Sequence, residues 1–137
     1  MNPKRNLIRL HFLLIAVLAL QACGAANAVK RAETIEQKAY AAEGTYTIWS
    51  EKGIELIERG NLPDNISLRL IQVEEQATPV VDSLSDSLEE FELVKDEFEA
   101  GTTGEERLII ASNSLNSWIE RALPLITRLK AAVKGAQ

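Results

Sequence analysis

The chemically active side chains are unevenly distributed along this chain of 137 residues. Its single histidine, His11, and its single cysteine, Cys23, both lie near the N-terminus. The rest of the chain has no imidazole or thiol, which excludes His/Cys metal sites, serine–histidine triads and disulfide bonds from the body of the protein. Carboxylates are the main reactive groups that remain there. The sequence therefore predicts no cofactor.

The densest polar segment extends over residues 82–99 and is rich in acids. Asp82, Asp86 and Glu90 recur every four residues, so on a helix their carboxylates form an acidic face. Such a face binds a hard cation or a basic partner, or it is a solvated surface, and no glycine-containing ligand loop accompanies it. Glycosidase chemistry also uses paired carboxylates, but it requires a cleft that desolvates one of them. We therefore expect a protein that is not an enzyme and has no small-molecule substrate.

Cys23 has the one assignable chemical role. It directly follows an apolar run that ends at Ala22 and is preceded by three basic residues, which is the layout of a secretory signal too short to stay as a transmembrane helix. Leu20, Ala22 and Cys23 resemble the lipobox of bacterial lipoproteins, in which a peptidase cleaves before a cysteine diacylated on its sulfur. The resemblance implies a signal peptide over residues 1–22. Because Gly24 rather than an aspartate follows the cysteine, the resemblance also implies sorting to the outer membrane.

A second cleavage site competes with the first. Ala26, Asn27 and Ala28 form an A-x-A sequence, and cleavage after Ala28 releases a soluble periplasmic binding module. Cleavage before Cys23 instead leaves residues 23–32 as a short tether between the lipid and a helical domain over residues 33–137. Both alternatives predict export. Only cleavage before Cys23 predicts a membrane anchor that faces the periplasm.

The net charge separates the leader from the rest of the chain. Residues 1–22 carry three bases and no acid, so the remainder holds 12 bases and 20 acids and has a net charge of −8. A field of this sign repels phosphate backbones. The sequence therefore predicts no nucleic-acid binding through a general basic surface.

Apolar residues in the body recur at alternating intervals of three and four, which predicts three amphipathic helices. We expect them at about 33–59, 65–99 (kinked at Pro79) and 104–134 (kinked at Pro124). Gly60 can cap the first helix, and Thr103 with Glu106 fits a capping box for the third. The predicted fold is all-α, an elongated up-down-up three-helix bundle after an N-terminal signal peptide. The residues expected to face the core are Ile35, Ala39, Ala42, Tyr46, Trp49, Gly53, Leu56, Ile66, Leu70, Val73, Ala77, Val80, Leu84, Leu88, Phe91, Phe98, Leu108, Ala111, Leu115, Trp118, Ala122, Leu125, Leu129 and Val133.

Folding the helices back on one another at the turns predicts which charged side chains meet. Opposite signs face each other throughout, and exposed pairs of this kind contribute only about 0 to 1 kcal/mol each. They therefore indicate orientation more than stability. The expected neighbours are Arg107 with Glu97, Arg121 with Asp82 and Asp86, Arg128 and Lys130 with Glu74 and Glu75, and Lys38 with Asp86.

Isoleucines outside the core-facing stripes widen the apolar surface of the first and third helices. Each helix of a bundle touches two neighbours, which accounts for part of this width. The remainder predicts a docking surface for a second copy or for another envelope protein. The off-stripe residues are Ile48, Ile54, Ile57, Ile109, Ile110 and Ile119, and all but Ile119 are expected to form that surface.

The lipobox-like leader and the Ala-, Leu- and Glu-rich helices resemble the small helical lipoproteins of Gram-negative bacteria. Within that set, residues 39–46 and 77–82 resemble short lipoproteins encoded by phages and prophages, often near lysis genes. The resemblance implies an accessory protein in lysis or superinfection exclusion. The expected partners are the membrane, through acylated Cys23, and another protein or a second copy.

Overall fold

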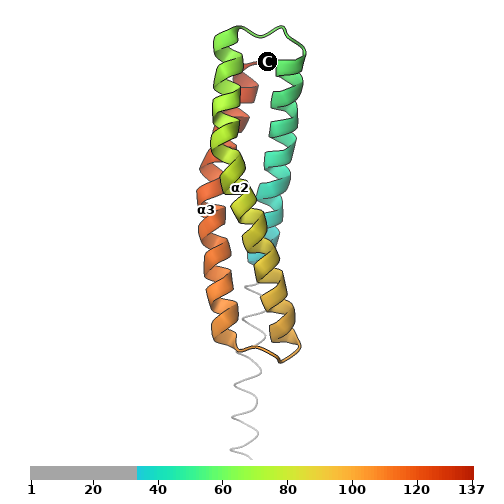
Figure 1. Ribbon diagram of the computed structural model, residues 1–137, viewed down its shortest axis with the longest axis vertical. Coiled ribbons are helices and arrows are strands. Elements are labelled where there is room, and N and C mark those ends of the chain that lie inside the picture. Colours follow the sequence, from blue (N-terminus) through green and yellow to red (C-terminus); the bar gives the residue numbers. More distant parts are fainter. Residues whose placement is uncertain (1–33) are drawn as a thin grey trace, which may run out of the picture.

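The computed structural model describes residues 34–137, which form three helices and no strand. The first helix covers residues 34–58, α2 covers Asp64–Glu99 and α3 covers Glu105–Gly135. Figure 1 shows the helices side by side in an elongated bundle with its two turns at opposite ends. This arrangement confirms the predicted all-α fold of three packed helices. With 36 residues, α2 is about 54 Å long.

The predicted signal peptide, Cys23, the tether and the Ala28 site lie outside the described residues. Among residues 34–137, no helix combines the length and the apolar character that a membrane span requires.

Glycines in the left-handed conformation form both turns. Gly60 has φ 68° and Gly101 has φ 72°, and their backbone N–H groups donate to the carbonyls of Ile57 and Phe98, each at 3.0 Å. A Cβ atom disfavours this conformation, which is why glycine serves as the helix cap. The predicted capping box of α3 is wrong, because Gly104 precedes the helix and no side chain caps it.

Both long helices pass through a proline without a break. Pro79 lies inside α2 and Pro124 lies inside α3. A proline leaves the carbonyl four residues earlier without its helical N–H donor. Both prolines are exposed, as are Glu75 and Glu120 four positions before them, so water can satisfy the two carbonyls. The outer position of each proline therefore explains why the helices tolerate them.

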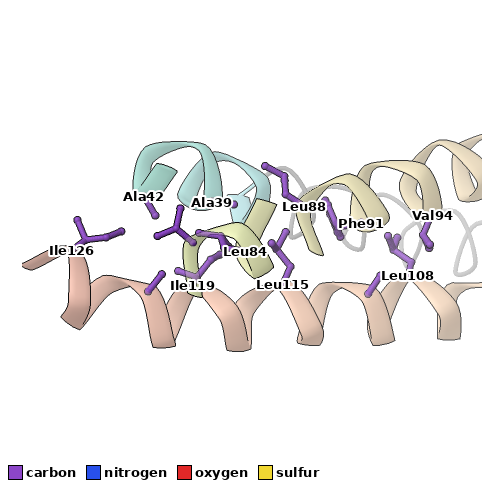
Figure 2. Close-up of a cluster of buried hydrophobic side chains, with 13 residues drawn as sticks. Ala39, Ala42, Leu84, Leu88, Phe91, Val94, Leu108, Leu115, Ile119 and Ile126 are labelled. Atoms are coloured by element: carbon purple, nitrogen blue, oxygen red, sulfur yellow. The ribbon is translucent and has the colours of Figure 1, made fainter. Parts of the chain in front are cut away.

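The main core lies where all three helices meet. Figure 2 shows small side chains of the first helix, Ala39 and Ala42, facing larger apolar side chains of α2 and α3. A second cluster of Leu70, Leu129 and Val133 lies near the turn between the first helix and α2. The main cluster consists of Ala39, Ala42, Val81, Leu84, Leu88, Phe91, Val94, Leu108, Ala111, Leu115, Ile119, Ala122 and Ile126.

The core-facing side of α3 is wider than the sequence pattern predicts. Ile119, which was placed outside the stripe, is only 3% exposed, and Ile126 is equally buried. Since α3 packs against both other helices, residues on two adjacent sides of it are covered. The predicted core aromatics Tyr46, Trp49 and Trp118 are only half-buried.

Polar contacts between the helices agree only in part with the predicted charge pairs. Arg107 pairs with Glu97 at 2.7 Å, as expected, and Lys95 pairs with Glu36 at 2.6 Å. The ion pairs expected for Arg121, Arg128, Lys130 and Lys38 do not form among residues 34–137. The folding rule gives the relative height of two residues, but it does not give their direction around the helix axis. Relative height alone therefore did not predict which ion pairs form.

Candidate interaction groove

A hollow of about 320 Å³ opens on the surface between the first helix and α3. Apolar side chains form most of its lining, and Lys38 and Lys130 lie at its edge. We call this hollow the groove. The residues that line it are Lys38, Ala41, Ala42 and Thr45 from the first helix and Ile119, Leu123, Ile126, Thr127 and Lys130 from α3.

The groove arises from a difference in side-chain size between the two helices. The first helix contributes Ala41 and Ala42, while α3 contributes branched residues at the same height. Because the alanines end at Cβ, they leave space beside Ile119 and Ile126, whose side chains are buried on the core side. Leu123 is 48% exposed and forms the outer edge. The groove is thus an apolar surface that the fold leaves open to solvent.

Three lysines surround Trp49 beside the groove. The Nζ atoms of Lys52, Lys130 and Lys134 lie 4.8, 5.6 and 5.7 Å from the centroid of the indole ring. Each position is within the range of a cation–π contact. None of the three ammonium groups forms an ion pair with a carboxylate of the described chain. We call Trp49 and these lysines the lysine–tryptophan cluster.

The tertiary structure brings this cluster together. Gly53 of the first helix lies against α3, and a Cβ at that position would be 3.5 Å from Val133 Cγ2. The close approach places Trp49 beside the last turns of α3, where Lys130 and Lys134 are separated by one helical turn. Sequence analysis missed the cluster because it links residues about 80 positions apart. The available signal was local: from Arg121 onward, α3 carries bases and no acid.

The predicted docking isoleucines fall at two separate places. Ile48 and Ile54 are 52% and 44% exposed on the first helix, whereas Ile57 is half-buried against the second cluster. Ile48 follows Thr45 by three positions and precedes Lys52 by four, so it lies on the side of the first helix that borders the groove. Ile109 and Ile110 are exposed, but they lie about 30 Å from Lys130 along α3. The five residues therefore do not form one patch.

The acidic face is exposed on α2. Asp82, Asp86 and Glu90 all reach solvent. A hollow of about 250 Å³ lies beside the last two, lined also by Ser83, Ser87, Ser114 and Trp118. Arg121, expected at these acids, instead lies over the Trp118 ring at 4.7 Å from its centroid. Within residues 34–137, no group of acidic, histidine or cysteine side chains is arranged to hold a metal ion.

Tyr40 has a raised pKa. Its hydroxyl donates a hydrogen bond to the carboxylate of Glu92 on α2. This bond raises the pKa of Tyr40 to about 12, and the negative charges of Glu92, Glu36 and Glu43 act in the same direction. The phenol therefore remains neutral and links the first helix to α2 at physiological pH.

A second tyrosine links the same two helices without an acid. The Tyr46 hydroxyl lies 2.8 Å from Thr78 Oγ1, and the single hydroxyl proton of Thr78 is donated to the Glu74 carbonyl. Tyr46 is therefore the donor to Thr78. This bond links the first helix to α2.

Comparisons with protein-family models, with curated proteins and with solved structures find no match for this chain. The fold and the site define an elongated helical bundle. Its distinguishing feature is an apolar groove that ends at a cluster of cations.

Proposed function

We propose that this chain is a lipid-anchored helical interaction protein of the bacterial envelope, facing the periplasm from the outer membrane. Cys23 is the proposed lipidation site. Two or three acyl chains on one cysteine anchor a protein durably, whereas a single chain does not. The observation that carries the interaction role is the groove, which exposes Leu123 in its lining and has the exposed Ile48 on the same side of the first helix. Exposed apolar side chains gathered around a concave surface are typical of binding sites.

The direction of the bundle supports an anchor at the N-terminal side. The described chain begins in the half of the bundle that contains the α2–α3 turn, because Glu36 pairs with Lys95 there. Trp49 lies 15 residues beyond residue 34, which is about 22 Å along the first helix. An anchor before residue 34 would therefore hold the lysine–tryptophan cluster away from the membrane. In that position the groove is open to a periplasmic partner.

The bundle is proposed to act by binding rather than by catalysis. We further propose that it serves as a phage or prophage accessory in lysis or superinfection exclusion, a role that rests on the sequence resemblance of residues 39–46 and 77–82. A partner protein or a second copy would occupy the exposed apolar surface. Neighbouring holin or endolysin genes would support this setting.

Intact mass tests the anchor. The wild-type protein extracted from host membranes is expected to begin at Cys23 and to carry added acyl mass. Cys23→Ser should lose that mass and leave the membrane fraction, whereas Gly24→Asp should keep the mass and shift towards the inner membrane. An unmodified wild-type protein in the soluble fraction would contradict the proposed anchor.

Crosslinking tests the interaction role. A photo-crosslinking residue at position 48, beside the groove, is expected to capture a partner or a second copy in cells. The matched control is position 110, since Ile110 is also an exposed isoleucine but lies at the end of α3 far from the groove. Equal capture from both positions would contradict a role for the groove.

The second candidate is a soluble periplasmic binding module with the same groove. The A-x-A sequence that ends at Ala28 favours it, because signal peptidase cleavage there removes Cys23. In that case the mature protein begins at Val29 in the wild type and in Cys23→Ser alike. The mass measurement therefore distinguishes the two candidates.

A further inference from the structure

The groove and the lysine–tryptophan cluster form one continuous surface. Lys130 belongs to both, since it lines the groove and its Nζ lies 5.6 Å from the Trp49 ring centroid. The hollow is thus mainly apolar between the first helix and α3, with Lys38 at one end and Lys130, which belongs to the lysine–tryptophan cluster, at the other. A ligand that matches both parts must have an apolar chain and an anionic head.

We propose that this surface binds a fatty acid. Its carboxylate would lie among the ammonium groups of Lys52, Lys130 and Lys134, and its alkyl chain would extend along Leu123 and Ile126. This inference goes beyond the proposed function and does not depend on acylation of Cys23.

The charge distribution favours an anion at this end of the groove. The chain as a whole has a net charge of −5, yet three ammonium groups lie 4.8–5.7 Å from the centroid of the Trp49 ring, and none of them pairs with a carboxylate of the described residues. A carboxylate beside these ammonium groups is attracted by their positive charge. The indole of Trp49 supplies an apolar surface beside the charged group. Hydrogen bonds from ammonium to carboxylate are among the stronger ones in proteins.

The hollow itself is small enough to favour a single alkyl chain, whereas the protein partner proposed above would contact the exposed apolar surface around it. Its volume of about 320 Å³ is at the lower end of the range for small-molecule sites. An α-helix with side chains is about 10–12 Å across and requires a broader apolar surface on both sides. Here the exposed apolar residues that line the hollow are Ala41 and Leu123, and Ile48 is exposed nearby on the same side of the first helix. A narrow alkyl chain fits this shape better than a helix.

Tryptophan fluorescence tests the proposal directly. The chain has two tryptophans, so Trp118→Phe leaves Trp49 as the only reporter. The full chain, as its host produces it, is titrated with acetate, octanoate and dodecanoate below their micelle concentrations. Dodecanoate is expected to shift the Trp49 emission at the lowest concentration. Because each buried methylene contributes about 0.8 kcal/mol, Kd should fall about fourfold per methylene until the chain fills the groove.

Two variants, each with a matched control, separate the contribution of the carboxylate to binding from that of the alkyl chain. Lys130→Gln combined with Lys134→Gln is expected to raise the Kd for dodecanoate at least about tenfold, because hydrogen bonds to charged groups are lost. Its control is Arg107→Gln, which removes a cation at the far end of α3. Leu123→Asp should abolish the dependence on chain length. Its control is Ile110→Asp, which places the same charge at a similarly exposed apolar position, and circular dichroism checks that each variant is folded.

The possible outcomes are distinct. A Kd that is the same for acetate and dodecanoate would overturn the proposal in favour of a simple anion site. Binding of dodecanol as tight as that of dodecanoate, with no effect of the lysine variants, would overturn it in favour of apolar adhesion. An acidic amphipathic peptide that binds more tightly than dodecanoate would overturn the choice of ligand. No change in Trp49 emission together with no retention of labelled dodecanoate would reject the site.

Discussion

Two glycines in the first helix offer a direct test of how closely that helix packs on α3. Gly53 is buried against Val133, while Gly44 is exposed and a Cβ there would meet no atom within 4 Å. Both lie in the interior of the same helix, so replacing either with alanine brings the same gain in helix propensity. Only the alanine at position 53 also brings a new contact with α3.

The structure gives the expected size of both effects. Removing a glycine from a helix interior stabilises the folded state by about 0.8–1 kcal/mol, which is the whole effect expected for Gly44→Ala. At position 53 the new Cβ would lie 3.5 Å from Val133 Cγ2, an ordinary van der Waals distance. Burial of one methyl group adds about 0.8 kcal/mol, so Gly53→Ala should stabilise by nearly 2 kcal/mol. Larger side chains have no room there, and Gly53→Leu should destabilise by about 1–3 kcal/mol.

Thermal unfolding followed by circular dichroism measures these differences. For a domain of this size, 1 kcal/mol corresponds to a change in Tm of about 4 °C. We therefore expect Tm to rise by about 4 °C in Gly44→Ala and by about 7 °C in Gly53→Ala. A Tm for Gly53→Ala below that of Gly44→Ala would refute the close packing of the first helix on α3. The placement of Trp49 beside Lys130 would then fail as well.

Further predictions concern the core, a turn, an ion pair and a titrating phenol. Phe91 is fully buried, so Phe91→Ala should lower the free energy of unfolding by about 3–5 kcal/mol in urea, and a loss under 1 kcal/mol would contradict its position. Gly60 has φ 68°, so Gly60→Ala should cost about 1–2 kcal/mol in the same assay. Arg107→Gln should cost at most about 1 kcal/mol, and the difference should shrink as salt is added. The Tyr40 phenol should titrate near pH 12 by its ultraviolet absorbance and return towards its ordinary value of about 10 in Glu92→Gln. Since its pKa is raised in the folded state, its contribution to stability should be complete below about pH 10 and lost between about pH 10 and 12.

The proposed anchor and the proposed ligand suggest one arrangement in the envelope. Acylation of Cys23 would keep the chain at the outer membrane, with the start of the groove at Lys38 close to the first described residues and the lysine–tryptophan cluster farther along the first helix. A fatty acid bound there would change the charge and the apolar exposure of the surface beside Ile48. The fatty acid and the protein partner would then either compete for the same surface or bind to it at the same time. Crosslinking from position 48 with and without dodecanoate distinguishes these two cases.

The local sequence determined the helices and most of the core. Apolar residues at intervals of three and four define one side of a helix whatever it packs against, which is why Leu84, Phe91 and Leu115 were predicted to be buried and are. The turn at Gly60 was equally local, because only the backbone conformation of that residue matters. The continuity of α2 follows from the unbroken stripe across Pro79.

The tertiary structure alone decided where the candidate site lies. Ile119 is buried because α3 packs against two helices, and Arg121 lies over Trp118 rather than beside Asp86 because its direction around the helix depends on that packing. The groove and the lysine–tryptophan cluster depend on the relative height of the first helix and α3, which no interval within one helix encodes. A repeat in the sequence determines which side of a helix is apolar. How two such sides meet depends on the sizes of all the side chains between them, including small ones such as the buried Ala42.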